Sequence, residues 1–136
     1  PLIKESGIQI GLGIQAHLYG DNKMSPEEYA QIFDAFGVPV IITETSVIMT
    51  HESGSDRLKK QADVYSRLIA GIQQSKNCNT VYIFGTDDST SWFERSIGEL
   101  EGASINADPL LFDDHLNPTF RTLEFRQVTF LHVRAE

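Results

Sequence analysis

Three short segments rich in apolar and β-branched residues alternate along the chain with segments of helical periodicity, and this alternation limits the possible folds most strongly. The strand-like segments are residues 8–17, 38–45 and 81–86. The last two are almost continuously apolar, as expected for strands of a parallel sheet that is covered on both faces. A strand followed by a helix, three times over, predicts parallel strands joined by right-handed crossovers. The sequence therefore predicts an α/β fold.

Helical patterns fill the gaps between these strands. The first helix, predicted over residues 25–37, starts with Ser25, which can cap the free amides, and Glu28, which completes a capping box. A second helix is predicted over residues 55–75, where apolar side chains recur at helical spacing. A third is predicted to begin at residue 117, and residues 126–136 fit a helix, a strand or a frayed tail.

The composition excludes several classes of protein. The 136 residues carry 11 Lys and Arg against 19 Asp and Glu, a net charge of -8 with no cluster of positive charge. This argues against a nucleic-acid partner, because binding to phosphate backbones depends on concentrated positive charge. No apolar run approaches the roughly 18 residues of a membrane span. The single cysteine, Cys78, excludes a disulfide scaffold, and no Cys or His spacing predicts a metal site.

All three predicted strands end in polar residues: His17, Glu44, and the pair Asp87 and Asp88. In an open doubly wound sheet and in a (β/α)8 barrel alike, the carboxyl ends of the strands form the functional face. Both architectures therefore stay open at this point. A glycine-rich phosphate loop would favour the open sheet. The glycines of residues 11–16, however, lie inside a strand and lack the third glycine and the following helix of a dinucleotide-binding fingerprint.

Four motifs occur in order along the chain. Residues 11–17 read G-L-G-I-Q-A-H, residues 40–44 read V-I-I-T-E, residues 84–92 read F-G-T-D-D-S-T-S-W, and residues 109–118 contain P-L-L-F-D and N-P. Together they resemble glycoside hydrolase family 10, the endo-1,4-β-xylanases, whose segments read Gly-Ile-Gly-Leu-Gln-Ser-His, Ile-Thr-Glu, Trp-Gly-Val-x-Asp-x-x-Ser-Trp and Pro-Leu-Leu-Phe-Asp. The resemblance implies the last three βα units of a (β/α)8 TIM barrel, with residues 1–136 as a single partial domain.

The resemblance implies a retaining double displacement. One carboxylate attacks the anomeric carbon, and a second, roughly 5 to 5.5 Å away, protonates the leaving oxygen. The nucleophile is assigned to Glu44, which follows a strand as catalytic residues of barrels do. His17 matches the histidine that orients this nucleophile, and Ser46 stands where the family has an Asp that orients the histidine. Without the resemblance, Glu44 fits a solvated strand-end carboxylate and His17 a partly buried imidazole bound to the backbone.

The resemblance also implies residues that bind sugar. Gln15 matches a polar position near the central sugar, Trp92 matches an aromatic of the subsites, and Phe84 replaces the first Trp of its motif. Phe can stack on a sugar face but lacks the indole N–H donor. A core position suits Trp92 equally well. The implied substrate is a β-1,4-linked, xylan-type polysaccharide, with no cofactor.

The second carboxylate of the family is missing from this chain. It lies in an Asn-Glu pair at the end of the fourth barrel strand, and no such dipeptide occurs here. Asp87 or Asp88 is the alternative source, because both follow a strand expected beside that of Glu44, and neighbouring strands lie about 4.8 Å apart. Otherwise, Asp88 matches a family Asp that we interpret as structural, and both residues fit caps of the following loop.

A three-strand piece of a barrel poses a folding problem. Both outer strands would have unpaired edges. The inward-facing side chains, expected to include Ile14, Ile42 and Ile83, would lack the opposing side chains that fill a barrel core. Two copies of the chain would supply six strands rather than eight. We therefore expect the missing barrel half, on the same polypeptide or on a partner chain, to complete the fold.

Three functional hypotheses follow. The chain is part of a retaining xylanase that carries the nucleophile and is inactive alone, or it is a degenerate barrel that binds xylan-type glycans without cleaving them. In the second case Trp92, Tyr19 and Phe93 would hold the glycan. The third hypothesis is a structural half-barrel that assembles with a partner chain. The family resemblance implies secretion to the extracellular space.

Overall fold

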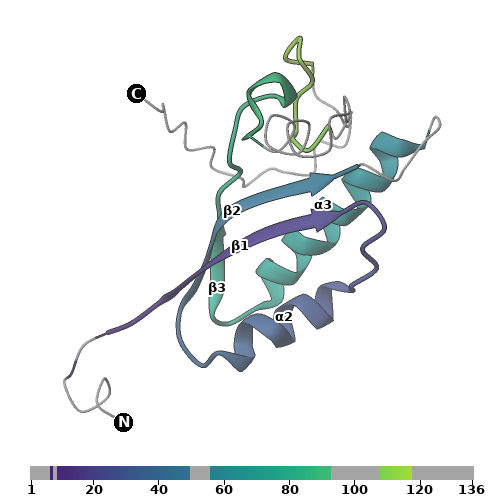
Figure 1. Ribbon diagram of the computed structural model, residues 1–136. Helices are drawn as coiled ribbons and strands as arrows, with labels where there is room; N and C mark the ends of the chain where they lie inside the picture. Colours follow the sequence, from purple (N-terminus) through teal and green to yellow (C-terminus); the bar gives the residue numbers. More distant parts are fainter. Residues whose placement is uncertain (1–6, 8, 50–55, 93–107, 118–136) are drawn as a thin grey trace.

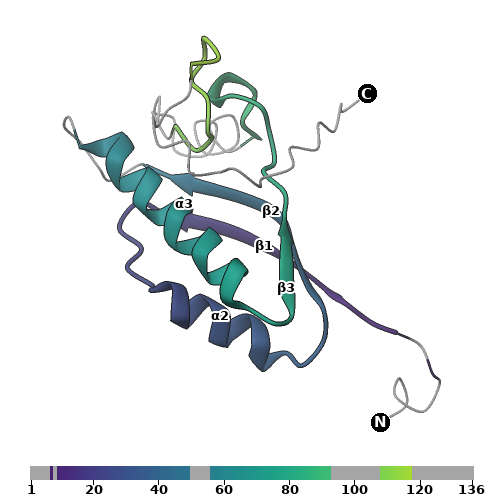
Figure 2. The same ribbon diagram turned by 180° about the vertical axis from the view of Figure 1, so that it is seen from behind.

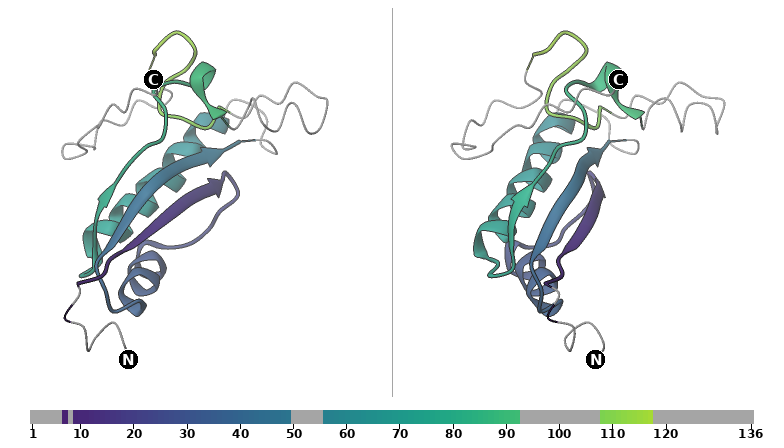
Figure 3. Two further views of the ribbon diagram at one scale, coloured as in Figure 1. Left: turned by 60° about the vertical axis from the view of Figure 1, so that its left-hand side comes forward. Right: turned by 90° about the vertical axis from the view of Figure 1, so that its left-hand side faces the viewer.

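A computed structural model shows a single parallel sheet with helices packed on one of its faces (Figures 1 and 2). It describes residues 7, 9–49, 56–92 and 108–117. Within these residues the sheet has three strands in the order β1-β2-β3, and both strand pairs are parallel. No helix of the described residues covers the opposite face of the sheet (Figure 3). The predicted α/β fold is confirmed, as is the order of its elements from the first strand to the third.

Six elements make up the described chain. They are β1 (Leu12–Tyr19), α2 (Pro26–Ala35), β2 (Val40–Ile48), α3 (Arg57–Gln74), β3 (Cys78–Val81) and the 3-10 helix η1 (Asp88–Thr90). The first helix has the predicted capping box, because Glu28 N donates to Ser25 Oγ and Ser25 N donates to Glu28 Oε2. The helix predicted to begin at residue 117 lies outside the described residues, except for its first position.

The core between the sheet and the helices corrects one prediction. Ile42 is fully buried and Ile14 packs against the same cluster, which α2 and α3 cover with aromatic and aliphatic side chains. Both residues therefore face the helices, and the prediction that they face the barrel interior is wrong. The reason is that an apolar strand buried on both faces gives no signal for the direction of its alternation. The cluster consists of Tyr29, Phe33, Val40, Ile42, Leu68, Ile72 and Cys78.

The third strand is shorter and earlier than predicted. It spans Cys78–Val81 instead of residues 81–86, and Tyr82 N then donates a hydrogen bond to Ile42 O of β2. The chain then leaves the sheet, and Ile83 packs on a second cluster with Val47, Tyr65 and Leu111. The second cluster, built partly from residues distant in sequence, thus takes up Ile83, whose apolar side chain had suggested a longer strand.

The other two strands also differ from their predicted bounds. The first starts later and runs to Tyr19, and the second continues to Ile48. The second strand extends past residue 45 because Ser46, Val47 and Ile48 continue the parallel pairing with the end of β1. Among the described helices, none combines the length and the apolar character that crossing a membrane requires.

Candidate active site

A β-bulge sets the register between the two strands that carry the candidate site. Ile14 pairs with Ile42, but the next residue, Gln15, pairs with Glu44, so Thr43 is the extra residue of β2. Successive side chains of a strand point to opposite faces, and an extra residue reverses this alternation locally. Glu44 consequently shares a face with Gln15, on the side of the sheet away from the helices. Without the bulge, it would point into the helix-covered core.

Two features of β1 accommodate the bulge. The hydroxyl of Thr43 donates to Ile14 O at 3.2 Å, which ties the extra residue to the neighbouring strand. Gly13 provides the space, because a Cβ atom at this position would lie 2.9 Å from Cγ2 of Thr43. The local sequence thus explains how the bulge is held, although no sequence pattern predicted it.

Glu44 is held by two side chains of β1. Gln15 Nε2 donates a hydrogen bond to Glu44 Oε1 at 2.9 Å. The other carboxylate oxygen, Oε2, lies 3.7 Å from His17 Nε2. The Glu44 side chain is 24% exposed and that of His17 19%. The carboxylate is therefore oriented by the protein and still open to solvent, an arrangement that suits attack on a bound molecule.

His17 is itself positioned from two sides. Its Nδ1 forms a 2.9 Å hydrogen bond with Oγ of the buried Ser46, which follows Glu44 by two residues on β2. Its ring meets Trp92 edge-on, with the ring centroids 5.4 Å apart and the planes at 75°. These contacts bring together four of the five predicted site residues: Gln15, His17, Glu44 and Trp92.

Trp92 and Phe84, two of the aromatic residues predicted to bind sugar, are both exposed to solvent. Trp92 is 40% exposed and Phe84 49%. Trp92 therefore lies against His17 with part of its ring accessible, rather than in the core. Phe84 lies in the segment that follows β3, where the chain has already left the sheet. Their exposure is compatible with stacking on a sugar ring, which uses the apolar face of the aromatic.

The two aspartates after β3 have structural contacts. Asp87 caps η1, accepting from Thr90 N at 3.2 Å, and Asp88 accepts a hydrogen bond from Leu110 N at 2.8 Å. Both residues are buried. Buried carboxylates bound to backbone amides are poorly placed to protonate a leaving group in solvent-open space, so the geometry disfavours them as the second catalytic carboxylate. It agrees with the interpretation of Asp88 as structural.

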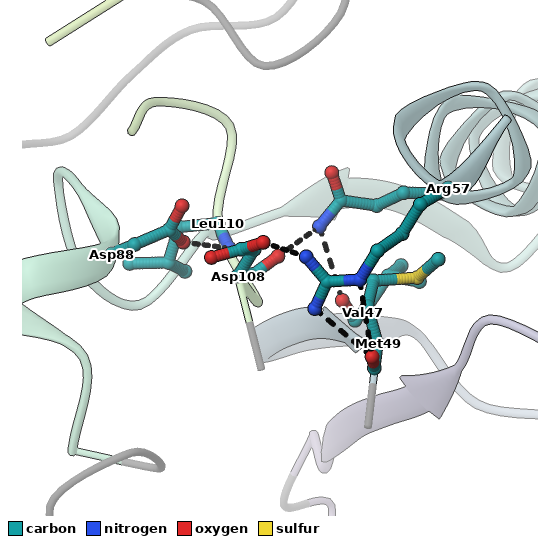
Figure 4. Close-up of polar contacts among 7 residues, drawn as sticks. Val47, Met49, Arg57, Asp88, Asp108 and Leu110 are labelled. Carbon is teal, nitrogen blue, oxygen red and sulfur yellow. Dashed lines mark hydrogen bonds and ion pairs between the residues drawn. The ribbon is translucent and has the colours of Figure 1, made fainter. Parts of the chain in front are cut away.

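A polar cluster anchors residues 108–111 to the carboxyl end of β2 (Figure 4). Arg57 forms an ion pair with Asp108 and donates to Met49 O, where the Nη2 distance is 3.0 Å. Gln61, which is fully buried, donates to Val47 O at 3.2 Å and to Asp108 O. The anchored segment thus lies next to the strand end that carries Glu44 and Ser46.

Tyr65 completes this anchor from the same helix. Its hydroxyl donates to Pro109 O at 2.8 Å, and Pro109 O also accepts from Val47 N at 3.0 Å. Burial raises the pKa of the Tyr65 phenol far above its ordinary value, so it remains a donor. The helical periodicity of residues 55–75 places Tyr65 on the apolar face of this helix and gives no sign of its hydrogen bond. Gln61, a polar residue one helical turn earlier on the same face, is the sequence feature that could have predicted a polar contact here.

No group of three or more His, Cys, Asp or Glu side chains with the arrangement of a metal site occurs among the described residues. The site consists of a carboxylate, an amide, an imidazole, a hydroxyl and an indole. Such groups can bind polyhydroxylated molecules and can attack an electrophilic carbon without a metal ion.

Parallel strands with helical crossovers fit an open doubly wound sheet and a TIM barrel alike, and the likeness to solved structures places these residues in the class of TIM-barrel proteins, as part of a barrel. The sequence model of glycosyl hydrolase family 10 matches residues 2–123. The chain belongs to this family.

Curated and solved relatives agree with this assignment. Endo-1,4-beta-xylanase 2 of Aureobasidium pullulans is 30% identical over 128 residues, which are 85% of this chain and 34% of that protein. The endo-1,4-beta-xylanase XylE structure of Penicillium canescens has a TM-score of 0.69 at 22% identity, covering 86% of this chain and 35% of its own. An intracellular xylanase of Thermoanaerobacterium saccharolyticum, solved as a mutant with xylotriose, has a TM-score of 0.63 at 27% identity, with coverages of 86% and 34%. The chain thus spans about a third of the length of these relatives.

Proposed function

We propose that this chain is the nucleophile-bearing part of a retaining endo-1,4-β-xylanase, comprising the last three βα units of its barrel. The observation that carries the proposal is the geometry of Glu44, a partly exposed carboxylate in the middle of β2 that Gln15 and His17 approach on its two oxygens. A nucleophile in glycoside hydrolysis must present one carboxylate oxygen to the anomeric carbon in a fixed direction. The bound xylotriose of the related Thermoanaerobacterium enzyme supports a xylan-type substrate.

In the proposed reaction, Glu44 attacks the anomeric carbon and forms a covalent glycosyl intermediate. His17 and Gln15 hold the carboxylate during this step, and Trp92 and Phe84 bind the sugar through their exposed ring faces. The acid that protonates the leaving oxygen, and later activates water, comes from the part of the barrel that precedes these units. Because the chain lacks this acid, it does not hydrolyse xylan alone. No cofactor takes part.

The uncovered face of the sheet supports a role for a further barrel half. Ile41 points to this side and is 41% exposed although it lies in the central strand. Gly13 of β1 and Gly11, which immediately precedes the strand, are also exposed. A central strand with an exposed apolar side chain requires a cover, and in a barrel the opposing strands supply it. We therefore propose that the preceding βα units, on the same polypeptide or on a partner chain, close the barrel.

Trapping of the intermediate tests the proposal. An activated 2-fluoro-xyloside should label Glu44 in the barrel completed by the preceding units, as seen by mass spectrometry of the labelled peptide. E44Q should abolish the label, whereas E27Q, a matched change at an exposed position of α2, should leave it intact. Label on another residue would refute the assignment of Glu44, and turnover of an aryl xyloside by this chain alone would refute its proposed inactivity.

The exposed aromatics support a second candidate function, a barrel that binds xylan-type glycans without cleaving them. Trp92 and Phe84 offer stacking surfaces whether or not Glu44 reacts. Titration of the completed barrel with xylo-oligosaccharides separates the two functions. Binding without labelling of Glu44 and without hydrolysis supports the binding function alone.

We propose from the family resemblance that the protein is secreted to the extracellular space. Secretion of a polysaccharide-degrading enzyme brings it to a substrate too large to enter the cell. The Thermoanaerobacterium relative, however, is described as intracellular, so location differs within the set of similar proteins. Detection of the protein in the culture medium rather than in cell lysate would support secretion.

A further inference from the structure

The two nitrogens of His17 have different neighbours. Nδ1 lies 2.9 Å from the hydroxyl oxygen of Ser46, and Nε2 lies 3.7 Å from Oε2 of Glu44. Nε2 is buried and has no hydrogen-bond partner among the described residues. Nδ1 thus faces a hydroxyl that can donate or accept a hydrogen bond. Nε2 faces a carboxylate, which in its ionised form can only accept.

These neighbours determine where a neutral imidazole carries its single proton. A lone pair on Nε2 would face the Glu44 oxygen with charge of the same sign, whereas an N–H at that position is attracted to it. The distance of 3.7 Å is too long for a hydrogen bond, but the sign of the interaction still selects the tautomer. With the proton on Nε2, the lone pair is on Nδ1, and Nδ1 must accept from Ser46.

We infer that Ser46 is a positioning residue whose hydroxyl donates to Nδ1 of a neutral His17 and so directs the Nε2–H toward Glu44. This inference rests on the proposed function only for the statement that Glu44 is the reacting group. Gln15 donates to the other oxygen of the same carboxylate. The series Ser46, His17, Glu44 and Gln15 therefore fixes the plane of the carboxylate from both of its oxygens.

The hydroxyl of Ser46 is the group that makes this arrangement possible. A carboxylate at position 46 would only accept and would require an N–H on Nδ1. The imidazole would then lose the Nε2 proton or bind a second proton. Thr preserves the hydroxyl, and Val has nearly the same shape without it. S46T, S46V and S46D therefore separate the donor from the packing of the side chain.

Nitrogen NMR of the barrel completed by the preceding units tests the inference without relying on activity. Spectra of histidine labelled with ¹⁵N are recorded at about pH 8, where an ordinary imidazole is uncharged. Loss of one set of signals in H17Q identifies His17. We expect Nε2 to be protonated and Nδ1 to be an unprotonated, hydrogen-bonded nitrogen, both in the unchanged chain and in S46T. The Nδ1 resonance should move to that of an unbonded nitrogen in S46V, and Nδ1 should be protonated in S46D.

Two results would overturn the inference: a proton on Nδ1 of the unchanged chain, or the same protonation in S46D as in the unchanged chain. If S46D does not fold, the pair S46T and S46V decides, and identical Nδ1 resonances in the two would refute the hydroxyl's role. Failure of fluoro-xyloside labelling with the expected NMR result would refute Glu44 as nucleophile and leave the tautomer assignment intact. The converse results would refute the role of Ser46 alone.

Discussion

Gln15 on β1 donates a hydrogen bond to Glu44 on β2 at 2.9 Å, and the two residues are directly paired across the strands because of the bulge at Thr43. This contact orients one oxygen of the candidate nucleophile without a charged partner. It also links the predicted sugar-binding residue to the predicted catalytic one, so a substitution of Gln15 should affect the chemical step as well as binding.

Replacement of Gln15 should therefore lower catalysis in the completed barrel. A hydrogen bond to a charged group contributes about 1.5 kcal/mol or more, so Q15A should reduce kcat/KM about tenfold. The free energy of unfolding should change little, because Gln15 is exposed. Q31A, at an exposed position of α2, is the matched control and should retain full activity. An effect on KM without any effect on kcat would assign Gln15 to sugar binding alone.

The buried hydroxyl of Tyr65 should contribute measurably to stability. Y65F removes the donor to Pro109 O and leaves a buried carbonyl with one bond fewer, which costs about 1 to 3 kcal/mol. Urea denaturation should show this loss in the free energy of unfolding. Y29F removes a hydroxyl that donates to the Asn22 side chain, a group that can reorient, and should cost less. Equal losses in the two variants would contradict the anchoring role of Tyr65.

Acid should weaken the junction between α3 and β3. Asp34 Oδ1 accepts from Ser75 Oγ at 2.7 Å and from the amides of Lys76 and Asn77. The Ser75 hydrogen bond, followed by the backbone amides, lowers the pKa of Asp34 below its ordinary value. A lowered folded-state pKa contributes stability above the ordinary pKa of about 4, and this contribution is lost as the pH falls through the folded value.

The variant D34N should therefore be less stable than the unchanged chain at neutral pH, and the difference should shrink as the pH is lowered below about 4. Urea midpoints across the pH range measure it. S75A removes the hydroxyl donor to this carboxylate, so D34N should cost less stability in the S75A background than in the unchanged chain. A stability gap that does not depend on pH would show that the ionisation of Asp34 is not the cause.

Much of the candidate site could be predicted because its residues lie in short sequence motifs. Glu44 and His17 follow apolar runs, and parallel strands bring their carboxyl ends to one edge of a sheet. The capping box of Ser25 and Glu28 is likewise a local signal, since its two hydrogen bonds join residues three apart. These features require no knowledge of distant contacts.

The remainder depends on contacts between residues far apart in sequence. The bulge at Thr43 arises from the pairing of two strands, and the apolar run around it gives no indication of which residues face the helices. The direction of Ile14 and Ile42 was therefore predicted wrongly. The end of β3 depends on packing of Ile83 against Leu111 and its neighbours, and the anchor of Arg57 on Asp108 joins two segments that no pattern connected.

Close packing of the two helices should make Gly71 intolerant of a side chain. A Cβ atom there would lie 2.5 Å from Cβ of Tyr29 and 2.9 Å from Pro26 O. Alanine normally favours a helix over glycine by about 1 kcal/mol, but this overlap should reverse the sign and cost about 1 to 3 kcal/mol. Urea denaturation of G71A measures the change. S66A, at an exposed position of the same helix, should be neutral or slightly stabilising, and a stabilised G71A would disprove the close approach.

The space beside Thr43 gives the sharpest test of the bulge. G13A should place a methyl group 2.9 Å from Thr43 Cγ2 and destabilise the pairing of β1 with β2 by about 1 kcal/mol. T43S removes Cγ2 but preserves the hydroxyl that donates to Ile14 O, so the double variant should recover most of the loss. A double-mutant cycle of urea unfolding gives the coupling energy.

Because the bulge also directs Glu44 toward Gln15, G13A should reduce fluoro-xyloside labelling of Glu44 in the completed barrel, and the double variant should restore it. Additive losses would mean that Gly13 is required for a reason other than the methyl group of Thr43.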